Sequence, residues 1–502
     1  MNKMPLHMKG SALAYGLVIM FMVSIVMTSI ISFVSGQTKY SLRVHAREQA
    51  FQIAESGIHF YRWYLAHQVE GRTAQQIATF WNSGNPYGVA TPYEVEYRDP
   101  NGGPVGRYRL EVTPPPAGST VVIVRASGWT YKYPDDKRFI QVRFRRPSWS
   151  ENAVLANDVM RFGSGTEVYG KIHSNQGIRF DGIAHNVVSS AVSTYDDPDH
   201  NGAVEFGVHT HVNPLPAVGV NDSFRAAEAL PNTPAARADV FMAGRSFPLP
   251  VVDFNGVLGD LSTMKSTAQN GTDNSRYFAN LNNDVGRKII LKTNGTFDTC
   301  RVASASLTGT TPTYDIAGTN GYKRPASNTT CNTCSGTCLQ NFPIPDNGII
   351  FVEDNLWLQG QINDKKVTVV AADLNGGSAP SVYIANDLSY TTYTGDDIIG
   401  VIGQNNIEIP KTSDTNLSID GALLAQQGRV GRPDYGTADH KDSITIHGAI
   451  ATNQRYGFAW TNGFQNWGYT DRNLYYDNSL LYYPPPYFPT GTQYEMDLWQ
   501  EQ

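Results

Sequence analysis

Charged side chains are scarce in this chain of 502 residues, where Asp, Glu, Lys and Arg together make up 17% of the sequence. The formal net charge of -6 is mild, and the basic residues are spread along the chain rather than clustered. A nucleic-acid surface needs a concentrated basic patch, so the composition argues against nucleic acid as a partner.

Sequence signatures of common catalytic sites are also missing. The chain has no nucleophile elbow, no Walker loop and no His-Glu-x-x-His motif. Each of these motifs places a nucleophile, a phosphate cradle or a metal-bound water at a fixed spacing. Without such a spacing, we interpret the chain as a protein that is not an enzyme.

Long apolar runs are nearly absent, because only one segment is apolar enough to cross a bilayer. This run extends from Gly10 to Gln37 without a charged residue. A bilayer core of about 30 Å needs about 20 apolar residues in a helix, whereas the apolar core of a secretory signal has about 7–15. The run is therefore long enough to span a membrane.

The apolar run continues without a helix stop into a polar segment that ends near His67. Small and apolar residues recur there at three- and four-residue spacing, which predicts an amphipathic helix with one packing stripe. The stripe consists of Ala50, Ile53, Ala54, Gly57, Ile58, Tyr61 and Leu65. A helix over residues 11–67 would be roughly 85 Å long at 1.5 Å per residue.

The N-terminal stretch resembles that of a type IV prepilin, with a short basic leader at residues 1–10. In that family a prepilin peptidase cuts after the glycine, which implies cleavage between Gly10 and Ser11. The segment "AFQIAESGI", residues 50–58, is similar to minor pilins of the PilX type. Major pilins carry a glutamate at the fifth mature position, whereas this chain has Tyr15, as in certain minor pilins and pseudopilins that lie at the filament tip.

The resemblance implies partners and a location. The helix over residues 11–67 would first anchor a single-pass precursor in the inner membrane. It would then pack against other pilins and minor pilins in an extracellular pilus, after processing by the prepilin peptidase. The head would lie in the periplasm or outside the cell.

Residues 68–148 are predicted to form a small antiparallel sheet. The runs "YEVEY", "RYRLEV", "TVVIVRASGW" and "RFIQVRFRR" are rich in β-branched and aromatic residues, and "DPNGGP" and "TPPPAG" supply turns. A long helix followed by such a meander matches the pilin plan. The fold class of this N-terminal part is therefore an α+β stem.

Residues 149–502 are predicted to form an all-β head, a right-handed parallel β-helix with a β-sandwich as the alternative. Four short stretches share an apolar–x–Gly–x–apolar pattern that is followed by a polar turn, which suits the sharp corners of stacked coils. They are "VYGKIHSN", "LQGQIND", "IDGALLAQ" and "IHGAIATN". The polar, weakly periodic region of about 190–345 is interpreted as loop insertions.

The chain has four cysteines, all within a short part of that region: Cys300, Cys331, Cys334 and Cys338. A thiolate zinc site is one interpretation, because tetrahedral sites use closely spaced cysteines. Outside the cytoplasm an even number of cysteines favours disulfides. We therefore predict two disulfides, whose connectivity the spacing does not decide.

The segment "YDDPDHNGAVEFG" predicts a cation site. Asp197, Asp199 and Asn201 alternate before a glycine, and Glu205 follows, as in short calcium loops where alternate oxygen side chains converge on one ion. Calcium is accordingly the one cofactor that the sequence suggests. A solvated acidic turn is the alternative.

Together these features predict a minor pilin of a type IV pilus or a related filament. Its stem would be embedded in the filament, and its head would be exposed for adhesion to a glycan or another surface ligand, or for tip assembly. The alternative is a membrane-anchored β-helix carbohydrate-active enzyme, because such enzymes place carboxylates in a groove. Asp396 and Asp397 are candidates, although no spacing singles out a catalytic pair.

Overall fold

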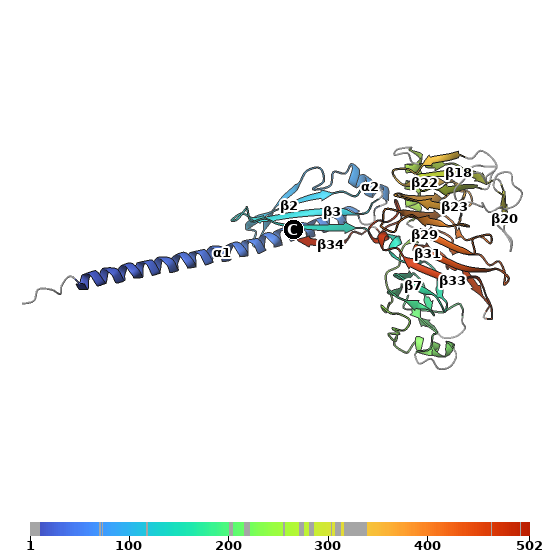
Figure 1. The fold of residues 1–502 in the computed structure, drawn as a ribbon, viewed down its shortest axis with the longest axis horizontal. Coiled ribbons are helices and arrows are strands. Elements are labelled where there is room, and N and C mark those ends of the chain that lie inside the picture. Colours follow the sequence, from blue (N-terminus) through green and yellow to red (C-terminus); the bar gives the residue numbers. More distant parts are fainter. Residues whose placement is uncertain are drawn as a thin grey trace, which may run out of the picture.

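The computed structural model describes most of the chain. The described residues are 11–69, 72, 74–116, 119–199, 204–214, 221–254, 257–270, 276–280, 286–302, 304–306, 313–315, 339–462, 464–491 and 493–501. They form a long helical rod, a stem in which a sheet packs on the rod, and a β-rich head at the far end (Figure 1).

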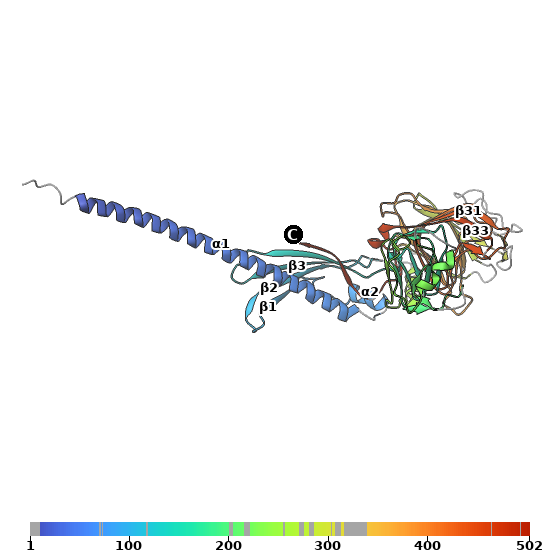
Figure 2. The same ribbon diagram turned by 90° about the horizontal axis from the view of Figure 1, so that it is seen from below.

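The rod is one continuous helix, α1 (Ser11–Val69), of 59 residues. Its first half projects away from the rest of the molecule, as both views show (Figure 2). Its second half packs on the sheet, and all seven residues of the predicted stripe are buried there. The predicted amphipathic half of the helix is thus confirmed.

The stem sheet has five antiparallel strands in the order β1-β2-β3-β4-β34. They are β1 (Tyr93–Arg98), β2 (Pro104–Thr113), β3 (Val122–Thr130), β4 (Arg138–Arg145) and β34 (Glu495–Glu501), and a short helix, α2 (Ala74–Asn82), lies before them. The four predicted strands are confirmed. The fifth comes from the C-terminus, so the predicted head span of 149–502 is corrected, because its last strand belongs to the stem (Figure 1).

The contact between rod and sheet is close because small residues face each other. A β-carbon added at Gly128 of β3 would lie 2.5 Å from the backbone nitrogen of Ala54 and closer still to the carbonyl oxygen of Ala50. Only glycine allows the two backbones to approach this far. The stem core around this contact includes Ile53, Ile58, Leu110 and Val124.

The head is a stack of short strands that pair in parallel with the coils above and below, as the predicted β-helix requires and a β-sandwich does not. One side of the stack holds β26 (Leu388–Tyr390), β29 (Asn416–Ala425), β31 (His440–Thr452), β33 (Asn466–Tyr476), β7 (Glu167–Tyr169) and β10 (Ile183–Ala184). Along it the residues Leu388, Ile419, Ile446, Leu474, Val168 and Ala184 form a buried ladder.

That ladder shows that the order of the coils along the stack differs from their order in the sequence. A second side holds β22 (Ile349–Val352), β24 (Lys366–Ala371), β27 (Ile398–Gly403), β5 (Val154–Ala156), β8 (Ile172–Ser174), β11 (Val188–Ser190) and β15 (Arg245–Ser246). Here β5, the first strand of the head in the sequence, pairs with β31, one of the last strands of the head. The chain therefore enters in the middle of the stack, winds outward in one direction, and returns from the opposite end.

A third side completes the coils, and smaller elements flank the stack. The third side holds β25 (Val382–Tyr383), β28 (Ile407–Glu408), β30 (Val430–Gly431), β6 (Met160–Phe162), β9 (Ile178–Phe180) and β14 (Val208–His209). The flanking elements are η1 (Trp149–Glu151), β12 (Thr194–Tyr195), β13 (Glu205–Phe206), η2 (Asn221–Glu228), α3 (Val257–Gln269), β19 (Ser304–Ser306), β20 (Thr313–Asp315), β32 (Ala459–Thr461) and η6 (Asn478–Leu481).

The region of about 190–345 contains part of the β-helix itself and is not made of loops alone. Its strands include β16 (Arg276–Phe278), β17 (Gly286–Leu291), β18 (Thr296–Val302) and β21 (Leu339–Pro343). β17 pairs in parallel with β23 (Asn355–Ile362), and β16 pairs in parallel with β22. This corrects the interpretation of the whole region as loop insertions, which its weak periodicity had suggested.

Candidate functional site

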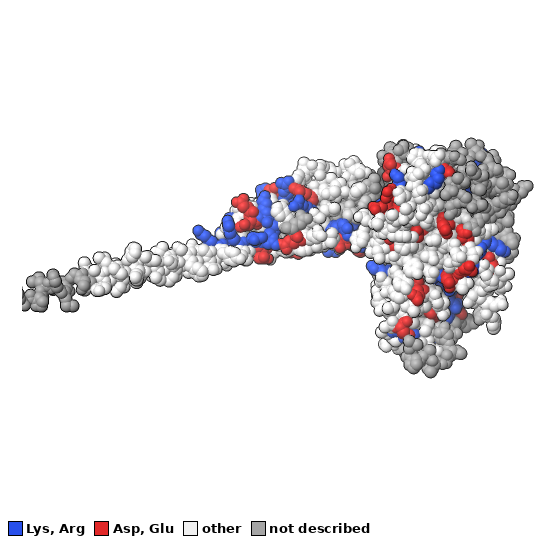
Figure 3. Space-filling view, in the orientation of Figure 1, with Lys and Arg blue, Asp and Glu red and all other residues white. Residues whose placement is uncertain are grey.

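The N-terminal half of α1 is an exposed apolar surface. By length and composition the helix from Ala12 can cross a membrane, and its most apolar stretch is fully exposed. Large apolar side chains such as Leu13 and Phe21 are 73% and 69% exposed. Charged residues begin only where the rod approaches the sheet (Figure 3). Such a surface needs lipid or other apolar helices around it.

The predicted processing site lies at the start of this helix. α1 begins at Ser11, whereas Gly10 and the rest of the leader lie outside the described residues. Tyr15, at the position where major pilins carry a glutamate, is 71% exposed. Cleavage between Gly10 and Ser11 stays a prediction.

One of the four cysteines lies in the described part of the chain. Cys300 is on β18, is 3% exposed and is disulfide-bonded. Cys331, Cys334 and Cys338 lie outside the described residues. The predicted pair of disulfides therefore stays a prediction as a whole.

The residues of the predicted calcium loop lie around the β12–β13 hairpin, except Asn201, which lies outside the described residues. Asp199 forms ion pairs of 3.2 Å with Arg161 and 2.8 Å with Arg455. Glu205 is buried and lies 2.6 Å from Arg225. Arginine thus already partners two of the predicted calcium ligands, and the calcium prediction itself is untested.

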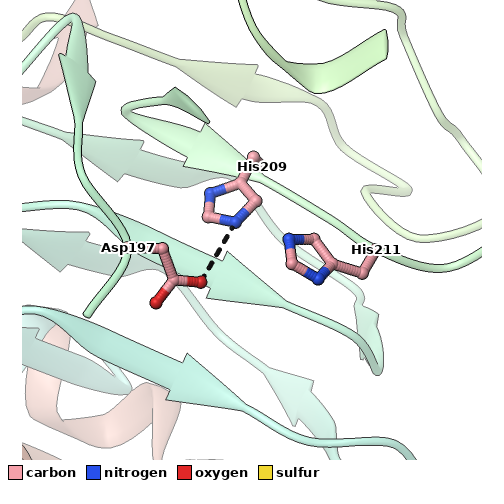
Figure 4. A group of neighbouring side chains, drawn as sticks. All are labelled: Asp197, His209 and His211. Atoms are coloured by element: carbon pink, nitrogen blue, oxygen red, sulfur yellow. Dashed lines mark ion pairs between the residues drawn. The ribbon is translucent and has the colours of Figure 1, made fainter. Parts of the chain in front are cut away.

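Asp197 lies in a different environment, next to two histidines that no predicted site included (Figure 4). Its Oδ2 atom is 3.5 Å from Nε2 of His209 on β14. The rings of His209 and His211 have centroids 5.0 Å apart. One ligand atom from each of the three side chains lies within 4.8 Å of the other two, and all three residues are buried.

Local structure explains why these side chains converge. Residues two apart in an extended segment point to the same side, so His209 and His211 share one face. His209 is in register with Arg179 of β9, and the backbone N–H of His211 donates a bond of 2.9 Å to Asp181. The signal that could have found the site is the His-x-His spacing shortly after an Asp-rich turn.

The charge of Asp197 is stabilised by its surroundings. Burial alone would raise the pKa of this carboxyl, but the interaction with His209 and the bond from the Asp199 backbone hold the pKa well below its usual range. That backbone N–H donates to Oδ1 of Asp197 at 3.0 Å. Asp197 is therefore a carboxylate that faces imidazole nitrogens, a donor set suited to a transition metal.

An arginine-rich cavity of about 540 Å³ lies beside this cluster. Five arginines and two aspartates line it, which leaves an excess of three positive charges: Arg161, Arg179, Arg429, Arg455, Arg472, Asp181 and Asp199. Tyr456, Phe458 and Trp460 also line it, and the guanidinium of Arg429 lies 5.1 Å from the Trp460 ring. Such a cavity suits a ligand with an anionic group and a flat apolar face.

The carboxylates that the enzyme alternative would use have structural partners. Asp397 is 1% exposed, and its Oδ2 atom accepts backbone N–H bonds from Thr391 and Thr392. In the cavity, Asp181 lies 2.6 Å from Arg179. An acid whose lone pairs are held in this way is poorly placed to transfer a proton to a substrate.

Comparison with known proteins bears on the N-terminal part of the chain. Residues 9–59 match the family described as PilX N-terminal. No curated protein shows a significant match to this chain. Among solved structures, the competence-associated pilin ComZ from Thermus thermophilus is 15% identical, over 91% of this chain and 97% of that chain, with a TM-score of 0.31. The family match confirms the predicted resemblance of the N-terminal segment to PilX-type minor pilins, over residues 9–59.

Proposed function

We propose that this protein is a minor pilin of a type IV pilus or a related filament, with its head exposed for adhesion. The observation that carries the proposal is the division of α1 into an exposed apolar half and a half that packs on the stem sheet. The first half suits the inner membrane in the precursor and the apolar helix core of a filament after assembly. The stem holds the head at the other end of the rod.

The head has a cavity that suits adhesion to an acidic glycan. Carboxylate groups of sugars pair with guanidinium groups, and sugar rings pack on aromatic faces such as Trp460. A cavity of about 540 Å³ matches a few sugar rings, whereas duplex nucleic acid needs an extended basic surface. Phe464, 97% exposed between β32 and β33, adds an apolar contact near the cavity residues Thr461 and Asn466.

Processing and assembly are tested in cells with an active prepilin peptidase. Intact-mass analysis of the membrane-extracted protein should show a chain that begins at Ser11, and the protein should appear in the sheared filament fraction. Gly10→Val should keep the leader and stay out of the filaments. The control Gly16→Ala, at a glycine with nothing within 4 Å of an added β-carbon, should be processed normally. A wild-type chain that still begins at Met1 would contradict the pilin assignment.

Adhesion is tested by binding of the purified full-length protein in detergent to polygalacturonate, with neutral dextran and duplex DNA as separate arms. Arg429→Gln should weaken binding of the acidic glycan by about 10-fold or more, because a charge-assisted bond is lost. The control Arg109→Gln changes the same charge on the stem. Stronger binding of DNA would overturn the glycan proposal, and shortening of the polysaccharide would favour the enzyme alternative.

A further inference from the structure

We propose that Asp197, His209 and His211 bind one divalent transition-metal ion of the zinc type, at a buried centre in the head. The donor set is one carboxylate oxygen and two imidazole nitrogens, which are common ligands of zinc. Three protein ligands leave one coordination position for water. This site differs from the predicted calcium loop, with which it shares only Asp197.

The distances suit a tetrahedral ion. With metal–ligand bonds of about 2.1 Å, the ligand atoms of a tetrahedral site are about 3.4 Å apart. The observed separation between Oδ2 of Asp197 and Nε2 of His209 is 3.5 Å, and no pair among the three ligand atoms exceeds 4.8 Å. Small side-chain rotations are therefore enough to bring all three atoms to bonding distance.

Burial gives a second reason to expect an ion. His209 is 0% exposed, and within the described part of the chain its Nδ1 has no hydrogen-bond partner, while its Nε2 faces only Oδ2 of Asp197 at a long 3.5 Å. A buried polar group without such a partner costs about 1–3 kcal/mol, and most are satisfied by protein, water or an ion. A metal ion between His209, His211 and Asp197 would satisfy the His209 nitrogen that faces Asp197 and so reduce this cost.

The chemistry of the site selects among cations. Calcium and magnesium prefer oxygen ligands, and calcium takes six to eight of them, whereas two of the three donors here are nitrogens. The neighbouring acid Glu205 is held by Arg225, and Asp199 by Arg161 and Arg455. These two carboxylates therefore already have cationic partners. Because two of the three remaining donors are histidine nitrogens, the site prefers a transition metal.

The ion would connect two segments that no ladder among the described strands joins directly. Asp197 follows β12, whereas His209 ends β14 and His211 follows it. Asp199, two residues after Asp197, contacts Arg161 and Arg455 at the cavity. Metal binding would thus fix the hairpin that orients two cavity arginines, which is a positioning role and not a catalytic one.

The test uses the full chain in detergent after treatment with a chelator. One equivalent of Co²⁺ should give the visible absorption of a tetrahedral nitrogen–oxygen site. One equivalent of Zn²⁺ should displace it and raise the unfolding midpoint by roughly 5 °C at saturation. Ca²⁺ should give neither effect. A midpoint that responds to Ca²⁺ and not to Zn²⁺ would overturn the proposal in favour of the acidic loop.

Variants assign the signal to this cluster rather than to the cysteines. His209→Ala and His211→Ala should each abolish the cobalt spectrum, and His185→Ala should retain it, because His185 pairs with Glu167 elsewhere in the head. If the wild-type protein gives no cobalt spectrum and no zinc-dependent shift, Asp197, His209 and His211 hold no metal ion and the proposal is wrong. A spectrum that survives in the His209 variant would place the metal elsewhere and equally reject the site.

Discussion

The side-chain amide of Asn157 donates a hydrogen bond of 2.8 Å to the side-chain oxygen of Asn453, 296 residues further along the chain. Asn157 also accepts a bond of 2.7 Å from the amide of Asn175 in the next coil. This asparagine ladder joins the coil in which the chain enters the β-helix to the coil in which it returns. Each coil covers a strand edge that the other would expose.

Asn157→Ala should lower the free energy of unfolding by about 1–3 kcal/mol, because it leaves the polar groups of Asn453 and Asn175 without this partner. The measurement is chemical denaturation of the full chain in detergent, followed by tryptophan fluorescence. Asn101→Ala, at an exposed turn of the stem, should change stability by no more than about 0.5 kcal/mol. Equal effects of the two substitutions would contradict the role of the ladder.

Gly128→Ala should loosen the stem, because the added methyl group meets the backbone of α1 at Ala50 and Ala54. Overpacking of this kind costs about 1–3 kcal/mol, and a rigid helix backbone cannot move aside as a side chain can. Thermal unfolding measures the loss. The matched substitution Gly163→Ala adds a methyl group where nothing lies within 4 Å, and it should leave the unfolding midpoint unchanged.

Glu353 should make stability depend on pH in the acidic range. Burial alone would raise its pKa, but the bonds from Lys265 of α3 and from Tyr277 hold the pKa below the ordinary 4.5. A carboxyl whose pKa is lower in the folded than in the unfolded chain stabilises the folded state at pH values above its ordinary pKa. This contribution is lost as the pH falls through the pKa of the folded state.

Glu353→Gln should therefore lower stability by about 1 kcal/mol or more at pH 7, and the difference from wild type should shrink below about pH 4.5. Denaturation curves at a series of pH values measure this difference. Glu48→Gln, at an exposed position of α1, should show no difference at any pH. A Glu353 effect that is constant across pH would show that shape rather than charge is responsible.

The cysteines should all be bridged in the native protein. Thiol titration of the denatured, unreduced chain should find none free, and Cys300→Ser should release one thiol and lower stability by about 2–4 kcal/mol. Four free thiols in the wild-type protein would contradict the prediction.

The sequence by itself determined the elements whose signals are local. The spacing of Ala50, Ile53, Ile58 and Leu65 placed the packing stripe of the rod, because a helix repeats every 3.6 residues whatever it packs against. Alternating residues and turn dipeptides placed the four stem strands. Two of the similar stretches, "IDGALLAQ" and "IHGAIATN", do form equivalent parts of the stack. Their glycines, Gly421 and Gly448, lie in register in neighbouring coils.

Tertiary structure alone decided how distant segments meet. The chain enters the β-helix in its middle, β34 returns to the stem, and Asp197 lies against His209 and His211. No repeating sequence pattern predicts these contacts. Each contact depends on which open coil or strand edge remains to be covered once the local elements have formed. Such pairings are fixed by burial of the whole apolar surface, which no short stretch of sequence specifies.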